Sequence, residues 1–415
     1  MTTPVRIPFP VVDEVSRHCL QEEEPETVHI EVHLPGPVDQ SRLRKAFTEA
    51  LHRHPRILMR EARGPWYRRR YEWELTTEPD VEVVTFAPAG PRALQDARTR
   101  ALTQAPPLSM SPPIRLEVVD SVLFLTINHT ALDGPACLRI LATAAELYGG
   151  TDNSPAAPPT RPAAPAQQAP DVPTTWSPPA RVAPGTPDPS PGNGMLVTEL
   201  PLPHRPKGSP YTVNDQLMVT TALTIAHWNR EHGVRPRPLR ITMPVDDRPR
   251  DTTMPIGNGT RLVEVPFSPT ELDHPDMSDL LRRTAERTRA LKSLPRPQLG
   301  HGAALLTAPW APVAARAALT RALRRTAAPW TSTTLLSNIG RIPYPLDFGE
   351  ETGRAHAVWF SAPARMPRGL TVTTASTAGR LHLALRWSRA LLSHGDGAHL
   401  RDLFEHYLHT TEVTP

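Results

Sequence analysis

The sequence is poor in lysine and in cysteine. Only Lys45, Lys207 and Lys292 are lysines among its 46 basic residues, and the formal net charge of the 415-residue chain is +4. A small charge spread over a whole chain does not predict nucleic-acid binding, which requires basic residues clustered on one face. Cys19 and Cys137 are too few for a disulfide framework, so we expect a protein that folds in its reduced state.

The sequence also lacks segments typical of secretion or membrane insertion. The first residues, MTTPVRIPFPVVDEV, have neither the basic region nor the apolar core of a signal peptide. Arginines interrupt the Ala-rich stretch 302–328, so no run of about 18 apolar residues remains. We therefore expect a cytoplasmic protein with no integral membrane association.

Several common enzyme motifs are missing. There is no Gly-x-Ser-x-Gly motif, no Gly-x-x-x-x-Gly-Lys-Ser/Thr loop, and the pair Gly257 and Gly259 lacks the third glycine of a dinucleotide-binding motif. His29, Glu31 and His33 alternate along a predicted strand and would share one face. That face could bind a metal, but with no fourth ligand nearby the pattern favours a solvated face, and we expect no metal site.

Two further segments leave alternatives open. Aromatic and basic residues alternate at 66–73, which would suit a single-stranded nucleic acid, but a half-exposed antiparallel strand with solvated arginines is favoured. The stretch 302–328 contains Trp310 and is followed by Trp330. It could lie on a membrane surface or line an acyl tunnel, although plain packing between the lobes is favoured.

The chain divides at a proline-rich segment. Residues 155–191 contain 13 prolines and few apolar residues, a composition that neither packs a core nor continues a helix. We therefore expect a linker or crossover there, between an N-terminal lobe, 1–154, and a C-terminal lobe, 192–415. At roughly 150 residues per domain, the length fits such a division.

Hydrophobic periodicity predicts helices and strands in both lobes. In the first lobe the expected order is strand, helix, strand, helix, at 28–34, 39–53, 122–127 and 135–149. In the second lobe we expect helices at 212–231, 270–293, 311–326 and 396–409, and strands at 239–243, 332–337, 369–376 and 381–387. This order predicts two α/β lobes with a cleft between them.

One segment has a pattern typical of a catalytic site. The apolar strand 122–127 leads directly into Asn-His-Thr-Ala-Leu-Asp-Gly, residues 128–134, so a histidine is mounted at the rigid end of a strand. His129 is therefore the candidate general base for a hydroxyl or amine. Asp133 is expected to hold the loop, and Gly134 to let the backbone turn tightly.

This motif and several other segments resemble the superfamily of thioester-dependent acyltransferases, which includes non-ribosomal peptide condensation domains, BAHD acyltransferases and polyketide-associated acyltransferases. The family motif is His-His-x-x-x-Asp-Gly or His-x-x-x-Asp. Other segments are similar to family segments in the same order. Arg53 to Leu58 resembles RHP-x-LR, and Val245 to Arg250 with Ile256 to Asn258 resembles VDxRxR followed by GN. Ser337 to Arg341 resembles SN-x-GR, and Leu346 to Gly349 resembles the start of DFGWG.

Two positions depart from the family pattern. Asn128 stands where condensation domains carry the first histidine of the doublet, and Glu350 stands where BAHD enzymes carry tryptophan. The second histidine of the doublet is the active residue in the family and corresponds to His129. The chain thus resembles bacterial free-standing condensation or polyketide-associated enzymes more than plant BAHD enzymes.

The resemblance implies an α/β fold, with two chloramphenicol-acetyltransferase-like lobes in a V shape and an active-site tunnel at their interface. His129 would act in the tunnel, and Asp133 would pair with an arginine of the other lobe, Arg248 as first choice and Arg341 as second. The N–H of Gly134 would lie near the oxyanion of the intermediate. The remaining motif residues are Asn128, Asn258, Ser337, Asn338, Gly340 and Asp347.

The resemblance further implies an acyltransferase that joins an acyl thioester to a hydroxyl or amine acceptor in natural-product biosynthesis. The donor would be a phosphopantetheine thioester on coenzyme A or on an acyl or peptidyl carrier protein, with no bound cofactor. A monomer is expected. Two alternatives stay open, because the same fold could cyclise, epimerise or dehydrate a tethered intermediate, or could recruit a carrier protein without catalysis.

Overall fold

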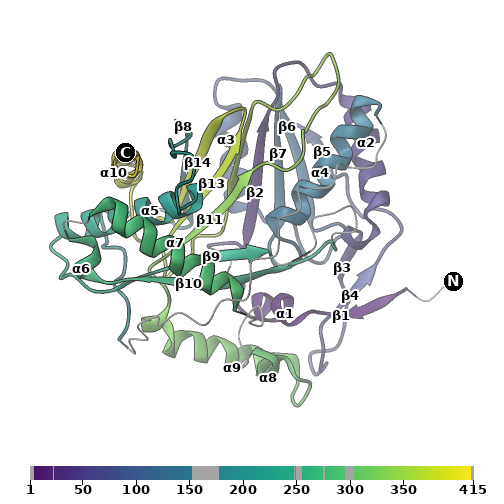
Figure 1. Ribbon diagram of the computed structural model, residues 1–415. Helices are drawn as coiled ribbons and strands as arrows, with labels where there is room; N and C mark the ends of the chain where they lie inside the picture. Colours follow the sequence, from purple (N-terminus) through teal and green to yellow (C-terminus); the bar gives the residue numbers. More distant parts are fainter. Residues whose placement is uncertain are drawn as a thin grey trace.

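The protein is a mixed α/β molecule, seen in a computed structural model (Figure 1). The structure describes residues 4–21, 23–151, 177–246, 248, 255–273, 276–294 and 303–412. Within these ranges the strands form a five-stranded, a six-stranded and a three-stranded sheet. The α/β class expected from the sequence is confirmed. Most of the predicted linker, at 155–176, lies outside the described residues.

The five-stranded sheet carries the histidine motif and has the order β12-β2-β7-β6-β5. Side chains of β7 alternate between two cores, because Leu123, Leu125 and Ile127 pack with helices α2 and α4, whereas Phe124 packs on the other face with Ala97 of α3. The elements are β2 (Thr27–His33), α2 (Gln40–Arg53), β5 (Val84–Phe86), α3 (Ala93–Thr103), β6 (Ile114–Val119), β7 (Val122–Asn128), α4 (Gly134–Gly149) and β12 (Ala357–Ser361).

The edge strand β12 comes from the second half of the chain and joins the sheet of the first half. It runs antiparallel to β2, with Ala357 opposite His33 and Ser361 opposite His29. Its carbonyl at Phe360 also accepts a hydrogen bond from Thr373 Oγ1, at 2.5 Å, on a strand of the other large sheet. The two halves of the chain are therefore interlocked through one strand.

The six-stranded sheet has the order β10-β9-β11-β13-β14-β8, with β11 parallel to both of its neighbours. Strands β13 and β14 form a hairpin whose turn residues Ala378 and Gly379 have φ values of 49° and 77°, as a tight two-residue turn requires. The strands are β8 (Asn193–Pro201), β9 (Leu239–Asp246), β10 (Thr260–Phe267), β11 (Thr334–Arg341), β13 (Leu370–Thr377) and β14 (Arg380–Ser388). Helices α5 (Val213–Glu231), α7 (Met277–Ser293) and α10 (His394–Thr410) contact this sheet.

The remaining elements lie along one edge of the molecule, the lower edge of Figure 1. They include the three-stranded sheet β1-β4-β3 and the helices α1, α8 and α9. Their bounds, with those of the short α6, η1 and η2, are β1 (Arg6–Pro8), α1 (Val11–His18), η1 (Pro55–Ile57), β3 (Met59–Glu61), β4 (Glu72–Leu75), α6 (Pro269–Leu272), α8 (Ala303–Thr307), α9 (Val313–Thr326) and η2 (Ala328–Trp330). In the described ranges, no helix combines the length and apolarity needed to cross a bilayer.

The solvated face predicted for His29, Glu31 and His33 is wrong. Both His29 and Glu31 are completely buried. Glu31 accepts two hydrogen bonds from the guanidinium of Arg98 on α3, at 2.7 and 2.9 Å, and one from His33 Nε2 at 2.6 Å. Burial alone would raise the pKa of Glu31, but its contacts with His29, His33 and Arg98 hold that pKa well below the usual value, so the charge is buried only because it is paired.

The strand predicted at 66–73 is also largely wrong. Only its end belongs to a strand, β4, which begins at Glu72. Trp66 and Tyr67 are exposed in a turn, whereas Tyr71 and Trp73 are buried in the core. The alternation of aromatic and basic residues therefore spans an exposed turn followed by a buried segment, and not one half-buried strand.

Arg386 on β14 fastens the two large sheets to each other. It is 1% exposed, and its guanidinium donates to Asn193 Oδ1 at 2.7 Å, to Thr27 O at 2.7 Å and to Thr27 Oγ1 at 3.0 Å. Thr27 begins β2 of the five-stranded sheet, and Asn193 begins β8 of the six-stranded sheet. Burial lowers the pKa of Arg386 to about 9, because removing the charged guanidinium from water costs free energy. The three hydrogen bonds offset part of that cost.

We expect Arg386→Met to lower the free energy of unfolding by about 2–4 kcal/mol, because it leaves buried acceptors of both sheets without donors. Urea unfolding followed by circular dichroism measures the change. Arg380→Met on the same strand is the matched control, since its ion pair with Glu199 is exposed and should contribute at most about 0.5 kcal/mol. Equal unfolding midpoints for the two variants would contradict the role given to Arg386.

Candidate active site

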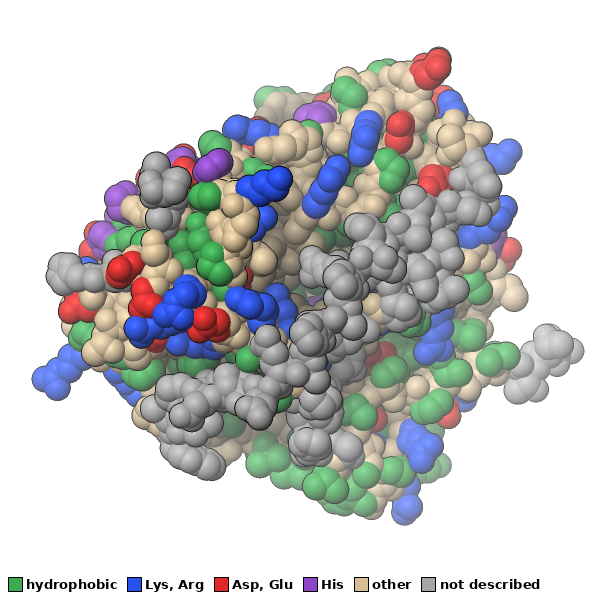
Figure 2. All heavy atoms as spheres, viewed as in Figure 1, with side chains coloured by type: hydrophobic (Ala, Val, Ile, Leu, Met, Phe, Trp, Pro, Cys, Tyr) green, Lys and Arg blue, Asp and Glu red, His purple; other side chains and the backbone are tan. Residues whose placement is uncertain are grey.

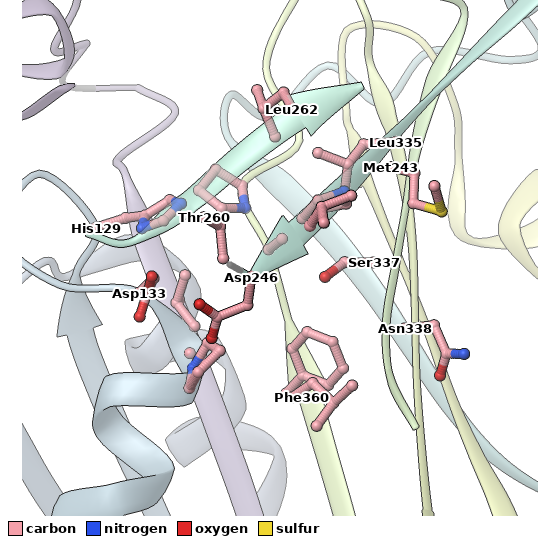
Figure 3. Close-up of a pocket in the computed structure, with 18 of the residues that line it drawn as sticks. His129, Asp133, Met243, Asp246, Thr260, Leu262, Leu335, Ser337, Asn338 and Phe360 are labelled. Atoms are coloured by element: carbon pink, nitrogen blue, oxygen red, sulfur yellow. The ribbon is translucent and has the colours of Figure 1, made fainter. Parts of the chain in front are cut away.

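A cavity of about 880 Å³ lies where the two large sheets meet. His129, Asp133 and Gly134 line it from the five-stranded side (Figure 3). Other lining residues come from β9, β10, β11 and β12 and include Met243, Thr260, Ser337, Asn338 and Phe360. A cavity of this size can hold an extended small molecule or two groups that react with each other.

His129 follows directly after β7, so a buried strand fixes its backbone. Its N–H donates to Glu26 O at 2.7 Å, and its side-chain Nδ1 lies 2.8 Å from Leu132 O. A carbonyl oxygen can only accept, so Nδ1 carries the proton of this hydrogen bond. In the neutral ring Nε2 is then the unprotonated nitrogen, which is the form that a general base requires.

Asp133 is fully engaged in holding the loop. It is the N-cap of α4, where its Oδ1 accepts from Ala136 N at 3.1 Å. Its Oδ2 accepts from Gly259 N at 2.8 Å and lies 2.9 Å from Nη2 of Arg248. Arg248 also pairs with Asp246 at 2.9 Å. Because its oxygens accept from Ala136 N, Gly259 N and the guanidinium of Arg248, Asp133 positions the chain and is not free to move protons.

Asn258 holds the histidine loop from the other side. Its Nδ2 lies 3.2 Å from His129 O, 3.0 Å from Thr130 O and 3.0 Å from Asp13 Oδ1, all three of which accept. The segment that contains Asn258 and Gly259 thus binds the histidine motif through both side chain and backbone. A side chain at Gly259 would collide with the guanidinium of Arg248, so this position needs glycine for space.

The tight backbone turn expected at Gly134 is a wrong prediction. Gly134 is not among the residues with positive φ, and it begins the regular helix α4. A Cβ added at Gly134 would meet no atom within 4 Å. Gly134 lines the cavity, so its missing side chain leaves space there beside His129. Glycine is not needed at this position to avoid backbone strain.

Among the other motif residues, Ser337, Asn338, Gly340 and Arg341 lie at the cavity. Asn338 Oδ1 accepts from Gly340 N at 2.8 Å, and Gly340 has a φ of 76°, which favours glycine at the bulge where the pairing of β11 with β13 shifts register. Arg341 is exposed, and within the described part of the chain it forms no ion pair with Asp133, so Arg248 occupies that place.

Two motif residues lie away from the cavity. Asn128 is buried, where its Nδ2 donates to Pro106 O at 3.0 Å and its Oδ1 accepts from Thr130 N at 3.1 Å. It therefore supports the loop from behind His129. Asp347 is exposed and accepts from Gly349 N at 3.0 Å, next to the end of α4.

Asp13 is a site residue that the sequence did not reveal. It is 3% exposed and accepts hydrogen bonds from Trp73 Nε1 at 2.9 Å and from Asn258 Nδ2 at 3.0 Å. Burial raises the pKa of Asp13 to about 6 against the lowering effect of these donors. No motif or periodicity marks Asp13, because its partners come from segments 60 and 245 residues away.

The structure supports neither a cysteine nucleophile next to His129 nor, in its described part, a metal site. Cys137 is completely buried in α4, and burial raises the pKa of its thiol well above the usual value, which disfavours a nucleophilic thiolate. Across the part of the chain that is described, no group of three or more His, Cys, Asp or Glu residues is arranged to hold a metal ion.

The sequence is similar to a mycobacterial protein over most of its length. It is 30% identical over 382 residues to an uncharacterized protein of Mycobacterium tuberculosis, found in two strains, and the match covers 82% of this chain and 84% of that protein. No family model matches the sequence.

Solved structures with similar folds cover nearly the whole chain. The condensation domain of Monacolin K polyketide synthase has a TM-score of 0.66 at 12% identity and covers 99% of this chain and 98% of its own. The starter condensation domain of rhizomide synthetase, in complex with C8-CoA and Leu-SNAC, has a TM-score of 0.65 at 15% identity, covering 97% and 93%. Trichothecene 15-O-acetyltransferase of Fusarium sporotrichioides has a TM-score of 0.64 at 12% identity, covering 99% and 96%.

We expect Gly134→Ala to leave the free energy of unfolding within about 0.5 kcal/mol of the unmodified protein, because the new methyl group enters open space. Gly259→Ala is the matched comparison and should cost about 1–3 kcal/mol, since its methyl group displaces Arg248 from Asp133. Chemical unfolding of both variants measures this. A larger loss for Gly134→Ala than for Gly259→Ala would restore the backbone requirement.

Asp13 should make the stability of the fold depend on pH. Its native pKa of about 6 exceeds the ordinary value of 3.8, so between these values the native state holds a proton that the unfolded chain releases. The contribution of Asp13 is therefore full below the lower value and is lost as pH rises through 6. The stability of the unmodified protein relative to Asp13→Asn should fall by roughly 3 kcal/mol between pH 4 and pH 7, measured by urea unfolding. A constant difference would contradict the shifted pKa.

Proposed function

Because the chain belongs to one family with the Mycobacterium tuberculosis protein and has the fold of condensation domains and related acyltransferases, we propose that it is a condensation-type acyltransferase. It transfers an acyl group from a phosphopantetheine thioester, on coenzyme A or a carrier protein, to a hydroxyl or amine in natural-product biosynthesis. The observation that carries this proposal is the hydrogen bond from Nδ1 of His129 to Leu132 O, which leaves Nε2 as the ring nitrogen that can accept a proton, in a residue that lines a cavity of about 880 Å³.

The proposed reaction is direct transfer with His129 as general base. Nε2 of His129 takes the proton of the acceptor while its oxygen or nitrogen attacks the thioester carbonyl carbon. The tetrahedral intermediate then expels the sulfur, which receives the proton from His129. An ester or amide and a free thiol result, and the histidine returns to its starting form.

Gly134 is the proposed source of a hydrogen bond to the oxyanion. It is the first residue of α4, and the first N–H groups of a helix have no acceptor within the helix. The positive end of the α4 dipole also lies at the cavity, which favours negative charge there. The charge of Asp133 at the same helix end is offset by its ion pair with Arg248.

The ligands of a structural neighbour support the choice of donor. The starter condensation domain of rhizomide synthetase was solved with C8-CoA and Leu-SNAC, which are a coenzyme A derivative and a pantetheine surrogate. A cavity of 880 Å³ has room for a pantetheine arm and an acceptor at the same time. We therefore favour a thioester donor over an oxygen ester.

A second candidate is proton transfer on a tethered intermediate. It is favoured by one neighbour, the epimerization domain of the third module of tyrocidine synthetase B, with a TM-score of 0.56 at 12% identity. The same neutral imidazole would then remove a proton from carbon in place of oxygen or nitrogen. Cyclisation, dehydration and carrier recruitment without catalysis remain in the test as outcomes.

The test is thiol release from a panel of acyl-pantetheine and acyl-CoA donors, with and without a pool of alcohols and amines. We expect release to require an acceptor and to fall by about 10²–10⁴-fold in His129→Ala, because a general base contributes rate of this order. His409→Ala, an exposed histidine on α10, is the matched control and should retain full activity.

The outcomes separate the candidates. Thiol release without an acceptor would contradict acyl transfer and indicate hydrolysis or an intramolecular step. A product of unchanged mass, or lighter by one water, with no acceptor joined, would support the second candidate. Acceptor-dependent release that is equal in His129→Ala and the unmodified protein would overturn the role of His129.

A further inference from the structure

Helix α9 buries two polar side chains and exposes two leucines. Arg316 is fully buried and donates to Glu14 on α1 and, through Nη2, to Arg69 O at 2.5 Å. Thr320, one turn later, is also buried and lies 3.3 Å from Nδ1 of His18. In contrast, Leu319 and Leu323 on the same helix are 39% and 45% exposed. Exposed leucines beside a buried arginine and threonine depart from the usual pattern of a surface helix, although Val313 and Ala317 of α9 are also buried.

The apolar exposure continues beyond α9. Leu305 on α8 is 73% exposed, Trp310 between the helices is 58% exposed, and Trp330 in η2 is 48% exposed. We call these three residues, with Leu319 and Leu323, the apolar patch. Hydrophobic side chains gather along the lower edge of the molecule, where α8 and α9 lie (Figure 2). Contiguous exposed apolar surface of this kind is typical of an interaction site.

Positive charge surrounds the apolar patch. The segment 303–330 contains four arginines and no acidic residue, and Arg321 and Arg325 are exposed. The turn at 63–70 packs against the start of α9, where Val313 N donates to Arg68 O at 2.8 Å. This turn also has no acidic residue, and it exposes Arg63, Arg69 and Arg70 together with Trp66, which is 79% exposed.

We propose that this edge of the protein binds peripherally to the surface of an anionic lipid bilayer. Exposed indole rings at both ends of an apolar helix face, flanked by arginines, match the composition of segments that lie in a membrane interface. Indoles prefer this interface, leucines enter the acyl region, and arginines bind lipid phosphates. A protein partner would need a surface that is both apolar and acidic. An anionic bilayer has both properties across its whole surface.

The apolar patch and the cavity share helix α9. Arg324 of α9 lines the cavity, whereas Leu323 beside it is exposed. A bilayer bound at the apolar patch would therefore lie next to one wall of the cavity. Membrane binding is nevertheless a property of the outer surface and does not depend on the reaction proposed for His129.

The experiment measures sedimentation of the full chain with phosphatidylglycerol/phosphatidylcholine vesicles and with pure phosphatidylcholine vesicles. We expect binding to the anionic vesicles that weakens as salt is added. Trp310→Ser with Leu323→Ser should reduce binding by at least roughly tenfold, because two apolar anchors are lost. Arg321→Gln with Arg325→Gln should remove most of the preference for anionic vesicles. Quenching of tryptophan fluorescence by brominated lipids tests insertion without any variant.

Matched controls come from other surfaces of the same chain. Leu202→Ser changes an exposed leucine outside the apolar patch, and Arg235→Gln changes an exposed arginine outside it, so both should bind vesicles normally. His129→Ala should also bind normally, which keeps this test separate from that of the reaction. No binding to anionic vesicles, or equal binding by the apolar-patch variants, would overturn the proposal. Binding of an acidic carrier protein, lost in these variants and without vesicle binding, would assign the surface to a protein partner instead.

Discussion

The ion pair between Asp133 and Arg248 is the contact on which the site depends. Asp133 caps α4 and follows the histidine loop, whereas Arg248 lies at the end of β9 in the other large sheet. The pair is nearly buried, so neither charge can lose its partner without a large cost. Gly259 N and Asn258 Nδ2 add hydrogen bonds to the same loop from the same side. The relative position of the two sheets and the position of His129 are therefore set together.

In this arrangement Asp133 and His129 have different partners. Asp133 lies four residues from His129, yet its oxygens accept from a helix N-terminus, a backbone N–H and a guanidinium. The orientation of His129 comes instead from a backbone carbonyl, Leu132 O. An uncharged acceptor fixes the tautomer without adding a second negative charge beside Asp133. The ring of His129 is thus oriented by a contact within its own loop, and the charged groups hold the sheets.

The sequence predicted the fold class and the local site better than the long-range contacts. Strand β7, helix α4 and their junction at 128–134 follow from periodicity and capping, and the resemblance led to the expectation that Arg248 faces Asp133, a contact that is present. Burial of His29 and Glu31 depends on Arg98 and on β12, which joins the first sheet from far along the chain. Asp13 and the buried polar side chains of α9 were missed for the same reason. Periodicity shows that a residue shares a face with others, but not what covers that face.

Much of the cavity lining lies outside the histidine loop, on strands of both large sheets. Condensation domains, an acetyltransferase and an epimerization domain share this fold, so the fold alone does not determine which reaction takes place. Thr260, Ser337 and Phe360 also line the cavity, from β10, β11 and β12. Strand β12 also pairs with β2 in the sheet that carries His129, so one strand contributes both to that sheet and to the lining of the cavity.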